Sequence, residues 1–274
     1  MIRCDSQTQR RRSERRGHGG TVTGELLTVT SITKRFGGVE ALAGCTLSVG
    51  EGSITGLIGP NGAGKTTLFN VISGLTPAVG GQIHLGADRL DGRSAHAIAR
   101  RGVGRTFQIP RPLGRMTVLE NVLVYAHDQP GERLARVFTA PKRVSAEEHR
   151  ARERAQAILV SMELAHLASA RAETLSGGQK KLLELARALM SDPRIILLDE
   201  PGAGVNPTLM RSLVEMIRAL RASGRTFLLI EHDMDLVTEL CDPVIVMAQG
   251  RKLMEGPFAE VRRDPRVLEA YLGT

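Results

Sequence analysis

The segment at positions 59–67 constrains the fold of this chain more than any other part of the sequence. It reads GPNGAGKTT, and Gly59, Gly64, Lys65 and Thr66 fit the spacing G-x-x-x-x-G-K-[ST]. A short apolar strand pattern precedes it, and a helical pattern runs from Lys65 to about position 73. Glycines let backbone N–H groups approach phosphate oxygens, and a helix N-terminus adds positive potential. The segment therefore predicts a phosphate-binding loop (P-loop) in an α/β fold, with a glycine turn beside a surface lysine as the simpler alternative.

A second strand end carries two adjacent carboxylates. The segment RIILLDEP at 194–201 predicts a buried parallel strand, with Asp199 and Glu200 at its carboxyl end. Ligands of open α/β sheets collect at such ends. Asp199 can hold magnesium through water, and Glu200 can orient or deprotonate an attacking water. The alternative is that the two carboxylates only cap the following segment.

A second phosphate-binding pattern stands more than a hundred residues after the first. The segment LSGGQ at 175–179 places Ser176, Gly177 and Gly178 directly before an amphipathic helix. A chain with a single P-loop has no second nucleotide of its own for this helix start. The pattern therefore suggests that Ser176 and its neighbours serve a nucleotide bound by another chain.

The segment LSGGQ resembles the signature of the ABC-type ATPases, in which two nucleotide-binding domains pack head to tail. In that family each ATP lies between the P-loop of one subunit and the signature of the other. The resemblance implies that Glu200, His232 and Gln108 are catalytic and that Thr66, Gln108 and Asp199 hold Mg²⁺. The ATP-binding residues that it implies are Phe36 (against adenine), Gly59, Asn61, Gly62, Ala63, Gly64, Lys65, Thr66 and Thr67 on one side, and Ser176, Gly177, Gly178 and Gln179 on the other. Asn206 stands where the family commonly has an aspartate.

This resemblance implies an α/β fold with a P-loop NTPase core of the ABC ATPase type. An N-terminal antiparallel β subdomain and an inserted α-helical signature subdomain would complete it. The expected divisions are a disordered basic tail at 1–25, an α/β core at 26–114 and 191–255, a helical subdomain at 115–190 with an insertion at 127–150, and a helical end at 256–274.

Residue patterns predict several individual elements of this fold. One edge strand is expected at 81–90, one helix at 118–126, and another helix from Ser145 to about 162 with the capping sequence SAEE at its start. Helices at 207–222 and 234–240 alternate with strands at 226–230 and 243–248.

Longer segments narrow the resemblance to one branch of the family. KRFGGVEAL, RTFQIPRPLGRMTVLENVLV, EPGAGVNP, IEHDMDLV and the ending YLGT are similar to the branched-chain amino-acid importer ATPases. Those systems use two ATPases, and the 68 positions from Gln108 to Ser176 indicate the longer one, of the LivG type. Urea and amide importer ATPases share most of these signals, so the solute stays open.

The family resemblance also implies partners and a location. It predicts two integral membrane permease subunits, a shorter ABC ATPase or a second copy as the paired subunit, and indirectly an extracytoplasmic solute-binding protein. The chain would then lie on the cytoplasmic face of the inner membrane. The apolar segment IPRPLGRMTV at 109–118 is predicted to form part of the groove for the permease, with an ordinary proline-rich loop as the alternative.

Charge and composition leave one other class of function open. The net charge is +8, and the first twenty residues hold six arginines and two acidic residues. Such a tail can bind nucleic acid or anionic lipid, although a solvated tail or a misplaced start site explains it as well. The second hypothesis is therefore a soluble ABC ATPase that acts on nucleic acid, while the motif set favours transport without nucleic acid. The three distant cysteines show no metal-ligand spacing, and no apolar run approaches the roughly 20 residues of a membrane span.

Overall fold

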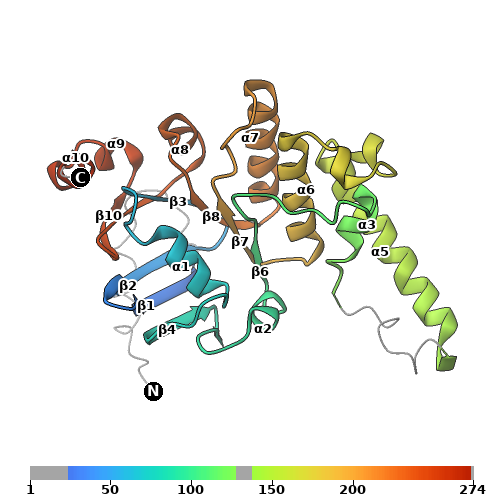
Figure 1. The fold of residues 1–274 in the computed structure, drawn as a ribbon, viewed down its shortest axis with the longest axis horizontal. Coiled ribbons are helices and arrows are strands. Elements are labelled where there is room, and N and C mark those ends of the chain that lie inside the picture. The colour runs from blue at the N-terminus through green and yellow to red at the C-terminus, as the bar shows by residue number, and fades with distance from the viewer. Residues whose placement is uncertain (1–23, 128–137, 273–274) are drawn as a thin grey trace, which may run out of the picture.

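Six strands form the central sheet of the molecule, and its inner strands are buried on both faces (Figure 1 shows the sheet). The computed structural model describes residues 24–127 and 138–272, so positions 1–23 of the predicted tail and part of the predicted insertion at 127–150 lie outside the described residues, while Glu25 of the predicted tail already belongs to strand β1 (Glu25–Phe36). The strand order is β10 (Arg251–Gly256), β9 (Val244–Ala248), β3 (Ile54–Ile58), β8 (Thr226–Ile230), β7 (Ile195–Asp199) and β6 (Val103–Arg105). All neighbours are parallel except β10 and β9.

Side chains alternate between two apolar clusters on the two faces of this sheet. In β7, Ile196 and Leu198 pack in one cluster, while Ile195 and Leu197 pack in the other. Because both faces are covered, the inner strand β7 is a continuous apolar run up to Asp199, as the sequence predicted. The polar side chains that follow these strands are thereby held at one edge of the sheet.

A second sheet is antiparallel and is built mainly from the N-terminal part of the chain. Its order is β2 (Val39–Gly50), β1 (Glu25–Phe36), β4 (Gly80–Leu85) and β5 (Asp88–Arg89). The antiparallel β subdomain predicted from the sequence is therefore present. The prediction of one edge strand at 81–90 is wrong, because a turn at Gly86, which has a φ of 58°, divides the segment into the paired strands β4 and β5.

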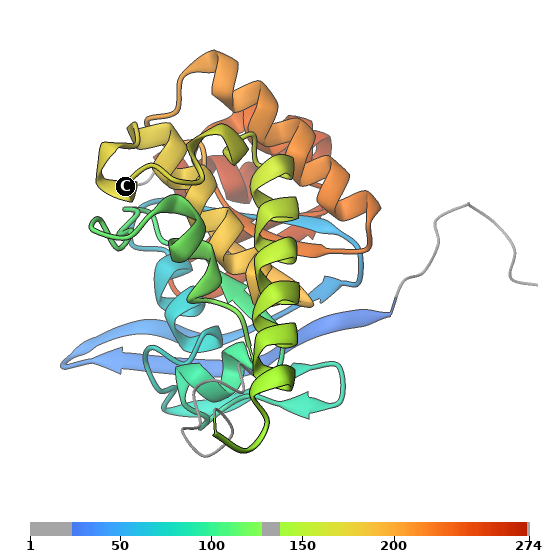
Figure 2. The same cartoon turned by 90° about the vertical axis from the view of Figure 1, so that its right-hand side faces the viewer.

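Helices cover the central sheet, and one group of them packs together on one side (Figure 2). That group is α3 (Val118–Leu123), α5 (Pro141–Ser161) and α6 (Gly177–Met190). The others are α1 (Lys65–Ile72), α2 (Ala95–Ala99), α7 (Pro207–Ala222), α8 (Met234–Leu240), α9 (Phe258–Val261) and α10 (Pro265–Leu272). Ala155 and Leu159 of α5 join the apolar cluster that also contains Leu183 and Ala186 of α6.

Two predicted helix boundaries are wrong. Helix α5 begins at Pro141 rather than at Ser145, because proline at the first helical position has its φ already set and needs no N–H partner. Ser145 therefore lies inside the helix and does not cap it. Helix α3 ends at Leu123, three residues before the predicted end. Across 24–127 and 138–272, no helix has the length and apolar content needed to cross a membrane.

Candidate nucleotide-binding site

The predicted phosphate-binding loop joins the end of β3 to the start of α1. Gly59 and Gly64 have φ values of 147° and 98°, which strain residues with a side chain. A Cβ atom on Gly59 would lie 2.1 Å from the Met247 carbonyl oxygen, and one on Gly64 would lie 2.5 Å from that of Ala41. The loop therefore packs against β9 and β2 at positions where only glycine fits.

Lys65 opens α1 and turns its ammonium group back over the loop. Its Nζ donates to the carbonyl oxygens of Gly59, at 2.7 Å, and of Pro60, at 2.9 Å. Burial lowers the pKa of Lys65, while the charges of Glu200 and Asp199 oppose that shift. The lysine is thus a buried cation at the loop, with the two predicted carboxylates in its electrostatic environment.

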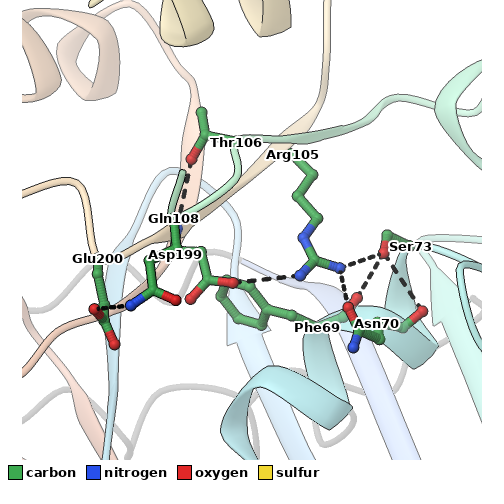
Figure 3. Close-up of polar contacts among 8 residues, drawn as sticks. All are labelled: Phe69, Asn70, Ser73, Arg105, Thr106, Gln108, Asp199 and Glu200. Carbon is green, nitrogen blue, oxygen red and sulfur yellow. Dashed lines mark hydrogen bonds and ion pairs between the residues drawn. The ribbon is translucent and has the colours of Figure 1, made fainter. Parts of the chain in front are cut away.

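Asp199 ends β7 beside the loop and is 5% exposed. Its Oδ2 lies 3.3 Å from Nη2 of Arg105, and its backbone N–H donates to the Thr106 hydroxyl at 3.4 Å (Figure 3). Burial raises the pKa of Asp199, and the guanidinium of Arg105 opposes this effect. The sequence analysis placed Asp199 correctly at a strand end but did not identify Arg105.

The three residues predicted to be catalytic meet at the carboxylate of Glu200. Gln108 donates its Nε2–H to Oε2 of Glu200 at 2.6 Å, and Nε2 of His232 lies 3.0 Å from Oε1 (Figure 3 shows the glutamine contact). Glu200 has a φ of 49°, an uncommon backbone conformation for a glutamate. Three segments that are distant in sequence therefore converge on one carboxylate.

Two further charged residues, neither of them predicted to belong to the site, support this arrangement. Glu231 is 3% exposed; its carboxylate accepts from the backbone N–H of Gly202 at 2.7 Å and of His232 at 3.0 Å. Lys181 of α6 donates to the Glu200 carbonyl oxygen at 2.9 Å. The position of Glu231 after the apolar strand in TFLLIEH could have indicated that it belongs to the site. Nothing in the sequence indicated that Lys181 contacts the segment that contains Glu200.

The signature segment forms a capped helix start away from the P-loop. The Ser176 hydroxyl accepts from the Gln179 N–H at 3.3 Å, and the Gln179 side chain accepts from the Ser176 N–H at 2.9 Å. A Cβ atom on Gly178 would lie 2.2 Å from Leu209, so the start of α6 packs closely on α7. Among the residues with described structure, no hydrogen bond or ion pair joins 176–179 to 59–67. Within the described part of one chain, the two phosphate-binding segments are therefore not joined by a direct polar contact.

Phe36, the residue predicted to contact adenine, ends β1 and is 51% exposed. The Lys34 ammonium lies 5.0 Å from the centre of its ring. The ring thus has open surface at the edge of the antiparallel sheet, where a base can stack on it. Asn206, at the position where the family commonly has an aspartate, accepts from the Leu209 N–H at 2.9 Å and caps α7.

The segment 109–118, which is predicted to form part of the permease groove, has exposed apolar side chains that lie over a buried polar residue. Ile109 and Leu113 are exposed, as is the neighbouring Phe107. Beneath them the fully buried Asn121 accepts from the Leu113 N–H at 2.8 Å and donates to the Leu113 carbonyl at 3.0 Å. The loop therefore has a fixed shape although its apolar residues face outward.

A buried ion pair of α6 also holds this loop. Nη1 of Arg187 lies 2.7 Å from Oε1 of Glu184, and the same two side chains bind the carbonyl and the N–H of Arg111, each at 3.2 Å. Nη2 of Arg187 contacts the Tyr125 hydroxyl at 2.5 Å. Burial raises the pKa of Glu184, and Arg187 opposes the shift.

Arg187→Met is expected to lower the free energy of unfolding by about 3–5 kcal/mol, because it leaves the Glu184 carboxylate buried without its counter-ion. Urea denaturation measures this change. The control is Arg266→Met, which removes an exposed arginine from its pair with Asp264 and should leave stability unchanged. Equal stability of Arg187→Met and wild type would show that the buried pair does not hold the loop.

Comparison with known proteins extends these observations. A family model described as "ABC transporter" matches residues 42–203, and one described as "Branched-chain amino acid ATP-binding cassette transporter" matches residues 251–274. A probable branched-chain amino acid transport ATP-binding protein LivG of Archaeoglobus fulgidus is 42% identical over 249 residues, which are 91% of this chain and 96% of that protein. The high-affinity branched-chain amino acid transport ATP-binding protein BraF of Pseudomonas aeruginosa is 43% identical, over 90% and 98% of the two chains.

A solved structure gives the same result for the fold. The crystal structure of a nucleotide-free ATP-binding cassette from an ABC transporter has a TM-score of 0.79 and 40% sequence identity, and the match covers 92% of this chain and 100% of that one. The chain therefore belongs to the ATP-binding subunits of ABC transporters, the ATPases whose turnover is coupled to transport. Within that class, it belongs to the family of branched-chain amino-acid transport ATP-binding proteins.

Proposed function

We propose that this chain powers the import of branched-chain amino acids through permease partners by hydrolysing ATP. The convergence of Gln108 and His232 on the carboxylate of Glu200, beside the P-loop, is the observation that carries this proposal. The names of the relatives support the solute class. Urea or another amide is the alternative solute.

The P-loop residues perform the first step, which is to hold the nucleotide. Backbone N–H groups of 59–67 surround the phosphates, Lys65 reaches the β- and γ-phosphates, and Phe36 stacks on adenine. Gly59 and Gly64 let this loop pack closely on β9 and β2, where a Cβ atom would clash with backbone oxygens. Ser176, Gly177, Gly178 and Gln179 bind the terminal phosphate of a nucleotide held by the paired subunit.

The donor chemistry at the sheet edge fits Mg²⁺. The Asp199 carboxylate, the Thr66 hydroxyl and the Gln108 amide oxygen would hold the ion; oxygen atoms are the ligands that it prefers. When bound, Mg²⁺ neutralises charge on the phosphates. Glu200 orients the attacking water and accepts its proton, and His232 contacts the terminal phosphate.

We further propose a division into an α/β core at 26–114 and 191–255, a helical subdomain at 115–190 and a helical end at 256–274. The segment 109–118, with Ile109 and Leu113 exposed, receives a cytoplasmic segment of the permease. The chain would then bind to the cytoplasmic face of the inner membrane through two permease subunits. A shorter ABC ATPase is the expected paired subunit, and a solute-binding protein acts on the outer side.

Ser176→Arg is expected to bind ATP as the wild type does but to weaken ATP-dependent pairing by about 10-fold or more, because a hydroxyl that binds the partner's phosphate is replaced by a bulky side chain. Light scattering after gel filtration measures pairing in the Glu200→Gln background. Thr117→Arg is the matched control, because it breaks the capping box of α3 instead of that of α6. Pairing that is as strong in Ser176→Arg as in Thr117→Arg would refute the proposed role of the signature.

An affinity pull-down tests the proposed assembly. Tagged Glu200→Gln protein is incubated with ATP and detergent-solubilised native membranes, and bound proteins are identified by mass spectrometry. Two multispan permeases and a shorter ABC ATPase are the expected partners. Recovery of ribosomal or nucleic-acid-binding proteins without a permease would contradict the proposal and favour the nucleic-acid hypothesis.

A further inference from the structure

The guanidinium of Arg105, at the end of β6, joins two elements of the site (Figure 3). Its Nη1 donates to Oδ1 of Asn70 and to the hydroxyl of Ser73, both at 2.8 Å. Its Nη2 donates to Oδ2 of Asp199 at 3.3 Å. Asn70 belongs to α1 and Ser73 caps its end, whereas Asp199 ends β7. One side chain therefore links the helix after the P-loop to the strand that carries the acidic residue.

Burial fixes the position of this side chain. The Arg105 side chain is only 7% exposed, and that of Asp199 is 5% exposed. The rings of Phe69 and Phe107 lie 5.7 and 5.3 Å from the guanidinium carbon. Nε of Arg105 is buried and has no hydrogen-bond partner within the described residues. The arginine therefore makes its other contacts while one of its buried N–H groups remains without an acceptor. A buried cation keeps such a position only when its partners are held in good geometry.

The two linked elements carry the residues proposed to hold Mg²⁺. Helix α1 begins with Lys65 and Thr66, and Asp199 stands at the end of β7. The link through Arg105 runs from Asn70 and Ser73, in the later part of that same helix, to the carboxylate. It therefore restrains the Asp199 side chain relative to the helix that presents Thr66. Lysine cannot replace it, because an ammonium group lacks the planar fork that reaches both sides.

We propose that Arg105 is a positioning residue for Mg²⁺, which sets the Asp199 carboxylate and helix α1 at the separation that the ion requires. The inference rests on the metal site given under the proposed function. Arg105 donates hydrogen bonds to Asn70, Ser73 and Asp199 and acts through Asp199, as outer-shell partners of metal ligands do. Loss of such a partner typically weakens metal binding by about 10–100-fold.

The test compares ADP binding with Mg²⁺ and with EDTA, by isothermal titration calorimetry on the full chain. For the wild type, the ratio of the two affinities measures the contribution of the ion. Arg105→Lys should reduce this ratio by about 10-fold or more and change the affinity in EDTA by less than about twofold. The double variant Asn70→Ala/Ser73→Ala should reduce the ratio in the same direction, because it cuts the link on the helix side and leaves the ion pair with Asp199 in place.

Arg225→Lys is the matched control. Arg225 pairs with Asp192 at 2.6 Å and donates to the Pro193 carbonyl, and it directly precedes β8, at the opposite end of the parallel strands from Asp199. Its replacement should leave the ratio unchanged. The double variant also keeps the test informative if Arg105→Lys does not fold.

Three results distinguish the ways in which this account can fail. A wild-type protein that gains no affinity from Mg²⁺ would refute the proposed metal site itself. If Mg²⁺ raises the ADP affinity of Arg105→Lys and of the double variant as much as that of the wild type, the role of Arg105 is refuted, while the proposed metal site is not. Equal losses with Mg²⁺ and with EDTA would also overturn it, because they would show that Arg105 supports the P-loop without acting on the metal ligand.

Discussion

Glu200→Gln is expected to bind ATP normally and to hydrolyse it about 10²–10⁴-fold more slowly than the wild type, as loss of a general base does. The amide keeps the size of the carboxylate and still accepts a hydrogen bond from Gln108, but it takes no proton from water. The closed pair of subunits should therefore accumulate with ATP. Phosphate release measures turnover, and equilibrium binding of a fluorescent ATP analogue measures affinity.

The control for Glu200→Gln is Glu163→Gln. Glu163 has a φ of 56°, similar to the 49° of Glu200, and it is an exposed residue after α5. Any effect of replacing a glutamate in this backbone conformation should therefore appear in both variants. Hydrolysis by Glu200→Gln at the rate of Glu163→Gln would remove Glu200 from its proposed role.

Lys65→Ala is expected to raise the Kd for ATP by about 30-fold or more, or roughly 2 kcal/mol, because it removes the buried cation at the phosphates. The loop itself should keep its conformation, since its packing on β9 and β2 depends on Gly59 and Gly64. Calorimetric titration with ATP measures the change. Hydrolysis at saturating ATP should also fall, because the lysine stabilises charge on the transferred phosphate.

Lys252→Ala serves as the matched control for Lys65→Ala. Lys252 lies in β10 and pairs with Glu255 at 3.1 Å, so its replacement also removes one lysine charge but takes it from a strand of the central sheet and not from the P-loop. Its ATP affinity should equal that of the wild type. A Lys65→Ala variant with the same affinity as Lys252→Ala would refute the P-loop assignment.

Much of the fold could be predicted because local signals agree with the tertiary structure. Helix α7 has the predicted bounds, 207–222, since Asn206 caps it and Pro207 fits its first position. The buried strands at 195–199 and 226–230 were equally clear as short apolar runs. The start of α5 was predicted wrongly because two sequence patterns each indicate a helix start. SAEE at 145–148 resembles a capping sequence, but the helix begins one turn earlier, at Pro141.

The candidate site was predictable in part for the same reason. Lys65 and Asp199 were predicted from motif spacing and flanking strands, and His232 was predicted from the family resemblance. Arg105 and Lys181 have no such signal, because their partners are brought to them only by the folded sheet and by α6, whereas Glu231 was indicated only by its place after an apolar strand. The role of the signature cannot be read from the contacts of one chain. Within one chain Ser176 caps its own helix, and its proposed ligand is bound by another subunit.

Solute uptake tests the central claim most directly. Native cells in which this chain is replaced by the Glu200→Gln variant are compared with cells that carry Glu163→Gln, and the high-affinity uptake of labelled leucine, isoleucine, valine and urea is measured. Loss of branched-chain amino-acid uptake in the Glu200→Gln cells alone, with urea uptake retained, is the predicted result. Unchanged uptake of all three amino acids would contradict the proposed function.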